Sequence, residues 1–387
     1  MKHLKKWWVL YFLILCFVVG FITMPFFHSS YFGALWNSLT TIKWYWQVLL
    51  FLGTLFFTLA LHELAHFVSF LLSGYKNEMI IILFFVFYKK YNKWKLKLDF
   101  KLLLLGGGMV FPSLGDINTK QDFYKARKAM QTSLLAAPLF TLISGLLFTT
   151  ITLIFFYTNS FLVPFSLFTL IFSLFYTYLS TKEAPGVYGD FKAYKRVKND
   201  DDFALVIVSQ YATSLPLYHI NLMKKHLEKQ KPINRDLISK SYFTILLDMA
   251  LQNDDIDYFV LEKVLFYSNS LISYSRLVSD SDNLDLAQAI IFYLERLNYK
   301  AEAAKLLNLF TITIEKSNLV NEAKTYYLKQ TKHILKISDE TLFLSDHKNI
   351  NKGKLTFIMR NIPSFIESED YKNKGYNRIK PLLPIKC

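Results

Sequence analysis

Four long apolar segments constrain this chain more than any other feature of its sequence. A helix needs about 20 apolar residues to cross the hydrocarbon core of a bilayer. Segments of this kind extend from Trp7 to Met24, from Trp44 to Ser73, from about Thr132 to Tyr157 and from Phe161 to Ser180. No small-residue cleavage site follows the first segment, which favours a retained span over a cleaved signal peptide. We therefore predict an α-helical multi-pass membrane protein with about four spans.

The composition agrees with a membrane protein that carries a soluble part. Of the 387 residues, 52% are apolar and 17% are aromatic, and the mean hydropathy is +0.24. Ordinary globular proteins are a little under half apolar. The two cysteines, Cys16 and Cys387, are too few for a disulfide framework or a cysteine-rich zinc site.

The net charge of +15 lies mainly in the apolar half of the chain. Residues 1–199 hold 20 Lys and Arg but 7 Asp and Glu. A nucleic-acid-binding protein would usually carry its basic surface on a soluble module. We therefore expect the lipid bilayer, and no nucleic acid, as a partner.

The links between the apolar segments differ in charge. Basic residues concentrate at the N-terminus, in the link 74–131 and after the fourth segment, whereas the links 25–43 and 158–160 carry one lysine between them. Cytoplasmic loops carry the excess of Lys and Arg in membrane proteins. We predict a protein of the cell (plasma) membrane with both termini in the cytoplasm.

The second apolar segment contains the sequence His-Glu-x-x-His, formed by His62, Glu63 and His66. Positions i and i+4 share one face of a helix, so both imidazoles can reach one metal ion. The glutamate beside them can take a proton from a metal-bound water. The alternative is a pair of histidines packed in a helix bundle, but each ionisable group in hydrocarbon costs roughly 2–3 kcal/mol or more. Metal binding is therefore favoured.

Three further motifs accompany His-Glu-x-x-His. They are Gly107-Gly108-Met109-Val110, Ala136-Ala137-Pro138-Leu139 and a Pro185 that precedes Asp190 by five residues. Together they resemble the site-2 protease family of intramembrane zinc metalloproteases, over about residues 50–195. The resemblance implies a Zn²⁺ cofactor and hydrolysis of peptide bonds in membrane-embedded or membrane-anchored proteins or peptides.

The resemblance also implies roles for single residues. His62, His66 and Asp190 correspond to the family's zinc ligands, and Glu63 corresponds to its general base. Asp116 is the rival third ligand, although it precedes the Ala-Ala-Pro sequence whereas the family's ligand follows it.

Residues 94–101 alternate between apolar and mostly basic side chains, Trp-Lys-Leu-Lys-Leu-Asp-Phe-Lys. This period predicts a half-buried strand at the membrane surface, paired in a small β-hairpin with a strand from Met79 to Tyr88. The free edge of the hairpin is a candidate site for an unwound substrate, by strand addition. The alternative is a sheet that merely closes the cytoplasmic mouth of the site.

The chain is predicted to comprise four regions. Residues 1–43 hold the first helix and an external loop, and residues 44–199 form the metalloprotease core. Residues 200–350 are expected to form an all-α cytosolic domain, the likeliest region to bind a cytosolic regulator. Residues 351–387 form a basic tail.

Two other interpretations remain open. The first is a non-catalytic membrane scaffold or transport accessory with a structural or decayed metal site, which is favoured by altered residues around Asp190. The second is a membrane zinc protease of the prenyl-protein-processing type. Its third ligand lies in a Glu-x-x-x-Asp sequence, which does not occur after His66.

Overall fold

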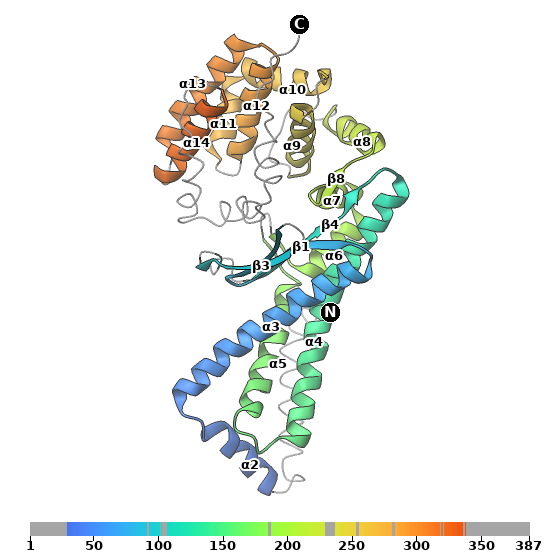
Figure 1. Cartoon of the computed structure of the whole chain (residues 1–387), viewed down its shortest axis with the longest axis vertical. Coiled ribbons are helices and arrows are strands. Elements are labelled where there is room, and N and C mark those ends of the chain that lie inside the picture. The colour runs from blue at the N-terminus through green and yellow to red at the C-terminus, as the bar shows by residue number, and fades with distance from the viewer. Residues whose placement is uncertain are drawn as a thin grey trace, which may run out of the picture. The chain divides into compact units, whose positions relative to one another are not determined.

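In a computed structural model, the chain divides into two compact units (Figure 1). Unit 1 comprises residues 1–62 and 137–181, and unit 2 comprises residues 63–136 and 182–387. Helices α3 (Trp44–Leu72) and α4 (Lys120–Phe155) each contribute residues to both units. The structure describes residues 29–90, 93–100, 102, 107–184, 187–228, 237–252, 255–280, 283–317, 319, 321–335 and 337.

Three helices among the described residues are long and apolar enough to cross a membrane: α3, α4 and α5 (Leu162–Leu179). Helices α3 and α5 confirm the segments predicted from Trp44 to Ser73 and from Phe161 to Ser180. The first predicted span, from Trp7 to Met24, lies outside the described residues.

Helix α4 begins at Lys120, well before the apolar segment predicted from about Thr132. A capping box starts it, because the backbone N–H of Asp122 donates to Thr119 Oγ1 (3.1 Å) and Asp122 Oδ2 accepts from the N–H of Thr119 (2.9 Å). The first turns of α4 are polar, so apolarity reveals the later part alone. Pro138 consequently lies inside this helix and not at its head, as the motif had suggested.

Unit 1 also contains a helix that was not predicted. The link 25–43, expected as an external loop, holds α2 (Ser29–Thr40). The hydroxyl of Tyr31 in α2 donates to the carbonyl of Leu153 in the last turn of α4 (2.7 Å). Carbonyls in this turn have no partner within their own helix, so α2 satisfies an acceptor at the end of α4.

Helices α4 and α5 approach each other closely at Gly145. A Cβ atom at this position would lie 2.4 Å from Ser173 Oγ and 2.8 Å from Ser173 Cβ. In α3, by contrast, a Cβ at Gly53 would have no atom within 4 Å. Small residues at helix contacts let the backbones of membrane helices come together. Gly145 therefore sets the packing of α4 against α5.

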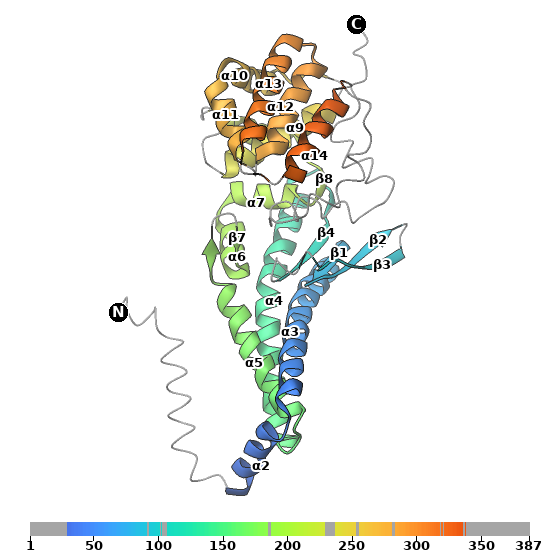
Figure 2. The ribbon, with the colours of Figure 1, turned by 90° about the vertical axis from the view of Figure 1, so that its left-hand side faces the viewer.

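Unit 2 contains a four-stranded antiparallel sheet in the order β3-β2-β1-β4 (Figure 2). Its strands are β1 (Lys76–Ile82), β2 (Phe85–Lys90), β3 (Lys93–Leu98) and β4 (Gly108–Ser113). The strand predicted at 94–101 corresponds to β3. The single partner strand predicted from Met79 to Tyr88 is wrong, because Leu83 adopts a φ of 54° and turns the chain between β1 and β2.

The sheet is buried near β1 and exposed at β3. Met79, Ile81 and Val86 form a core with Leu102 on one face. All six residues of β3 are exposed, so the prediction of a half-buried strand is also wrong. The reason is that β3 is an edge strand and that this core ends at β2.

The remainder of unit 2 is helical apart from short strands. The helices are α6 (Asp190–Asn199), α7 (Asp201–Ser209), α8 (Leu217–Glu228), α9 (Leu237–Gln252), α10 (Tyr258–Asn269), α11 (Leu271–Ser279), α12 (Leu284–Arg296), α13 (Lys300–Lys316) and α14 (Asn321–Ile334). Beyond residue 200, the described part departs from the predicted all-α structure at β8 (Ala212–Ser214), which pairs with β5 (Gly115–Asp116). The predicted tail 351–387 lies outside the described residues.

Candidate metal centre

The two histidines of the His-Glu-x-x-His sequence lie one turn apart on α3. Asp190 joins them from α6, and its Oδ2 lies 3.5 Å from His66 Nε2. One ligand atom from each of His62, His66 and Asp190 lies within 4.8 Å of the other two. The structure thus brings together the three residues that the resemblance pointed to.

Local backbone structure places Asp190 shortly after the end of α5. Strands β6 (Glu183–Ala184) and β7 (Val187–Tyr188) pair with each other, and the N–H of Gly189 donates to the carbonyl of Lys182 (2.9 Å). This bond brings the chain back on itself immediately before α6. Asp190 is the first residue of that helix, where the helix dipole favours a negative charge.

Hydroxyl groups on α4 orient both imidazoles. Thr141 Oγ1 donates its proton to the carbonyl of Ala137 (2.8 Å), so it can accept from the His62 Nδ1–H, 3.2 Å away. Ser133 Oγ lies 2.9 Å from His66 Nδ1. In each ring Nδ1 is engaged, which leaves Nε2 as the ligand atom. Because a hydrogen bond to the other ring nitrogen is the usual support of a metal-binding histidine, this arrangement fits a metal centre.

Glu63 lies beside the group, and Gly108 of β4 makes room for its side chain. A Cβ at Gly108 would lie 2.4 Å from Glu63 Cγ and 2.6 Å from both Glu63 Cδ and the carbonyl oxygen of Ile81. Any other residue at 108 would have to displace the glutamate or the strand. The Gly-Gly-Met-Val motif therefore has a physical reason at its second glycine.

The chemistry of the donor set fits zinc. Two imidazole nitrogens and one carboxylate oxygen match the three protein ligands of a catalytic zinc site, which keeps its fourth position open. His62 and Glu63 are 7% and 4% exposed, so the centre is largely withdrawn from water. Unpaired ionisable groups in such a place are costly, and a divalent cation compensates two carboxylates.

Asp116, the rival ligand, lies elsewhere. It is exposed on β5 and belongs to no metal-like group among the described residues. Sequence reasoning missed Ser133 and Thr141, although their spacing of eight residues with Ala137 midway puts them on one face of a helix.

A comparison with protein-family models matches residues 50–346 to Peptidase family M50. The chain belongs to peptidase family M50. This is the site-2 protease family, so the resemblance in the motifs is confirmed. A search of curated proteins and a search of solved structures each give no match. For this M50 protein, membership of the family implies a membrane metalloprotease.

The ligand assignment predicts different effects of two aspartate substitutions in the M50 chain. Asp190→Asn should weaken zinc binding by at least about tenfold, because even residues that merely support a ligand contribute 10–100-fold. Asp116→Asn, the matched control, should bind zinc like the wild type. Chelator competition and metal analysis of the purified full-length proteins measure both. Loss of zinc from Asp116→Asn with retention in Asp190→Asn would contradict the assignment.

Proposed function

We propose that this M50 protein is an intramembrane zinc metalloendopeptidase that hydrolyses peptide bonds of membrane-embedded or membrane-anchored proteins or peptides. The observation that supports this most is the buried carboxylate of Glu63, which lies on α3 between two histidines whose Nε2 atoms are available to a metal. A structural metal site would need the ligands alone. A carboxylate held beside them is the group that hydrolysis requires.

Glu63 moves the proton in the proposed reaction. Its carboxylate accepts a proton from the attacking water and delivers it to the nitrogen of the leaving amine, which restores the carboxylate. Bound zinc supplies a Lewis acid that lowers the pKa of a water molecule and polarises the scissile carbonyl. His62, His66 and Asp190 would hold the ion.

The register of β4 indicates which backbone groups a substrate strand would meet. Leu83 N–H donates to the carbonyl of Gly107 (3.2 Å), so these two residues form a hydrogen-bonded pair. Pairs alternate in an antiparallel ladder, so the next one, Ile82 with Gly108, is a non-hydrogen-bonded pair. Gly108 and Val110 therefore direct their N–H and C=O groups to the free edge of β4.

The opposite edge of the sheet is farther from the carboxylate. The N–H of Asp99 donates to the carbonyl of Phe84 (2.8 Å), so by the same alternation Leu96 points its N–H away from β2. Three strand spacings, about 14 Å, separate β3 from β4. Because Gly108 adjoins Glu63, an unwound substrate that reaches the carboxylate pairs with β4, and not with the 94–101 edge expected from the sequence.

The remaining features of the proposal concern the membrane and partners. The basic links support a plasma-membrane location with both termini in the cytoplasm. In that orientation the helices beyond residue 200 lie in the cytosol, where a regulator can bind residues 200–350. The non-catalytic scaffold remains the competing function, and the role of Glu63 separates the two.

Glu63→Gln should abolish cleavage and retain zinc. The amide keeps the size of the side chain but cannot accept the proton of water, and loss of a general base costs about 10²–10⁴-fold in rate. Comparative peptidomics of membranes containing the wild type or the variant identifies the substrates, and metal analysis measures zinc. Glu78→Gln, a change of the same kind on β1, is the control and should cleave normally. Unchanged peptides with Glu63→Gln would favour the scaffold.

Proline substitutions test the proposed substrate edge. Val110→Pro removes an outward N–H of β4 without removing a bond to β1, and should lower cleavage at least about tenfold with zinc retained. Val110→Ala keeps that N–H and should lower cleavage much less. Leu96→Pro makes the equivalent change on β3 and should leave cleavage within about twofold of the wild type. The reverse pattern would put the substrate on β3, and loss of zinc from the Val110→Pro protein would mean that the strand supports the metal centre instead.

A further inference from the structure

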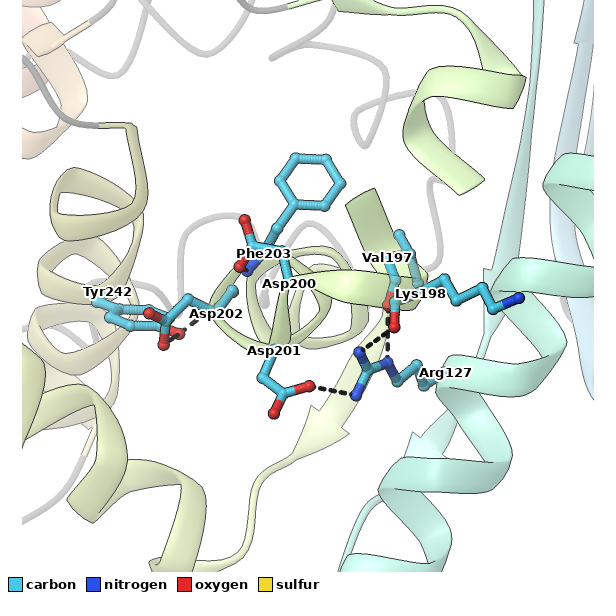
Figure 3. A network of polar contacts seen from close by, with 8 residues as sticks. All are labelled: Arg127, Val197, Lys198, Asp200, Asp201, Asp202, Phe203 and Tyr242. Carbon is cyan, nitrogen blue, oxygen red and sulfur yellow. Dashed lines mark hydrogen bonds and ion pairs between the residues drawn. The ribbon is translucent and has the colours of Figure 1, made fainter. Parts of the chain in front are cut away.

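Arg127 of α4 joins three groups at the junction of α6 and α7 (Figure 3). Its Nε donates to the carbonyl of Val197 (2.7 Å) and its Nη2 to the carbonyl of Lys198 (3.0 Å). Its Nη1 pairs with Asp201 Oδ1 (2.6 Å). The arginine is 9% exposed, so this guanidinium is a buried cation with specific partners.

Two of these partners are the free carbonyls at the end of α6. The last four carbonyls of a helix have no partner within it, and a cation there is also favoured by the helix dipole. Val197 lies seven residues from Asp190, which corresponds to about 10 Å along a rigid helix. Holding the end of α6 therefore fixes the direction in which its first residue points.

The same helix α4 supports the histidine side of the centre. Ser133, six residues after Arg127, contacts His66 Nδ1. One rigid element thus holds the imidazole of His66 through Ser133 and the helix of Asp190 through Arg127. The 3.5 Å separation of His66 from Asp190 depends on both contacts.

The turn that Arg127 holds is fixed from its other side as well. Asp200 caps α7 by accepting from the N–H of Phe203 (2.9 Å), and Asp202 accepts from the Tyr242 hydroxyl of α9 (2.8 Å). Burial, together with the hydrogen bond to and the charge of Asp202, raises the pKa of Tyr242 far above its ordinary value, so the hydroxyl remains a donor. The three consecutive aspartates each have a separate partner, and Arg127 has a firm counterpart.

We propose that Arg127 is a positioning residue of the metal centre, which sets Asp190 against His66 by holding the C-terminal end of α6. This inference rests on the proposed zinc site. Arg127 does not touch the metal ligands, so its influence passes through the helix that carries Asp190. A purely structural arginine would instead affect the folded protein without regard to Asp190.

A double-mutant cycle distinguishes these roles. Arg127→Ala should weaken zinc binding by about 10–100-fold, the usual effect of losing support for a ligand. In an Asp190→Asn background the same substitution should change zinc affinity by less than about twofold, because the ligand it positions is already gone. Chelator competition on the full-length protein in detergent measures both. The neighbouring Lys128→Ala removes one exposed charge from α4 and should leave the affinity unchanged.

A conservative variant keeps the test valid if Arg127→Ala does not fold. Arg127→Lys retains the charge but not the three-way contact, and should weaken zinc binding by about 3–10-fold in the wild-type background. In Asp190→Asn it should have no effect. The absorption bands of the Co²⁺-substituted Arg127→Lys protein should shift toward those of Asp190→Asn.

Two outcomes would overturn the inference. An equal loss of affinity in both backgrounds would make Arg127 a general stabiliser of the fold, and an unchanged affinity would make it irrelevant to the centre. If the wild type binds zinc in an Asp190-dependent way, either result leaves the proposed function intact. If the wild type binds no zinc at all, both the proposed function and this inference fail.

Discussion

The structure of the core depends on how two imidazoles and two carboxylates can be held together inside an apolar segment. His62, Glu63 and His66 lie on one helix that is otherwise long and apolar enough to cross a membrane. Ionisable groups in such a place are costly unless they pair with one another or bind a cation. The arrival of Asp190 from α6 gives the group the composition of a zinc site. The fold around it can be understood as the support that this constellation needs.

Much of that support comes from α4. Thr141 contacts His62 and Ser133 contacts His66, while Arg127 holds the helix that begins with Asp190. A metal ion binds well when its ligands are oriented before it arrives, which is the role of such outer contacts. The sheet contributes the remaining element, because Gly108 leaves space for the carboxylate of Glu63. The M50 core therefore combines a catalytic helix, a supporting helix and a strand that adjoins them.

The parts that could be predicted from the sequence are those set by local periodicity or by a motif. His62 and His66 share a face because of helix geometry, and Asp190 was found through the spacing of a family motif. Ser133 and Arg127 were not predicted, because their partners are about 70 residues away and no local pattern marks them. The turn at Leu83 was missed for a different reason. It lies within a continuous apolar run, and an apolar residue at positive φ gives no signal in the sequence.

The central claim is that one zinc ion is bound by two imidazoles and one carboxylate. Zinc K-edge X-ray absorption of the purified full-length protein tests it most directly. The account predicts one zinc per chain, with two imidazole nitrogens at about 2.0–2.1 Å and oxygen ligands at about 2.0–2.2 Å. A spectrum without scattering from two imidazole rings, or a shell of six oxygens alone, would contradict it.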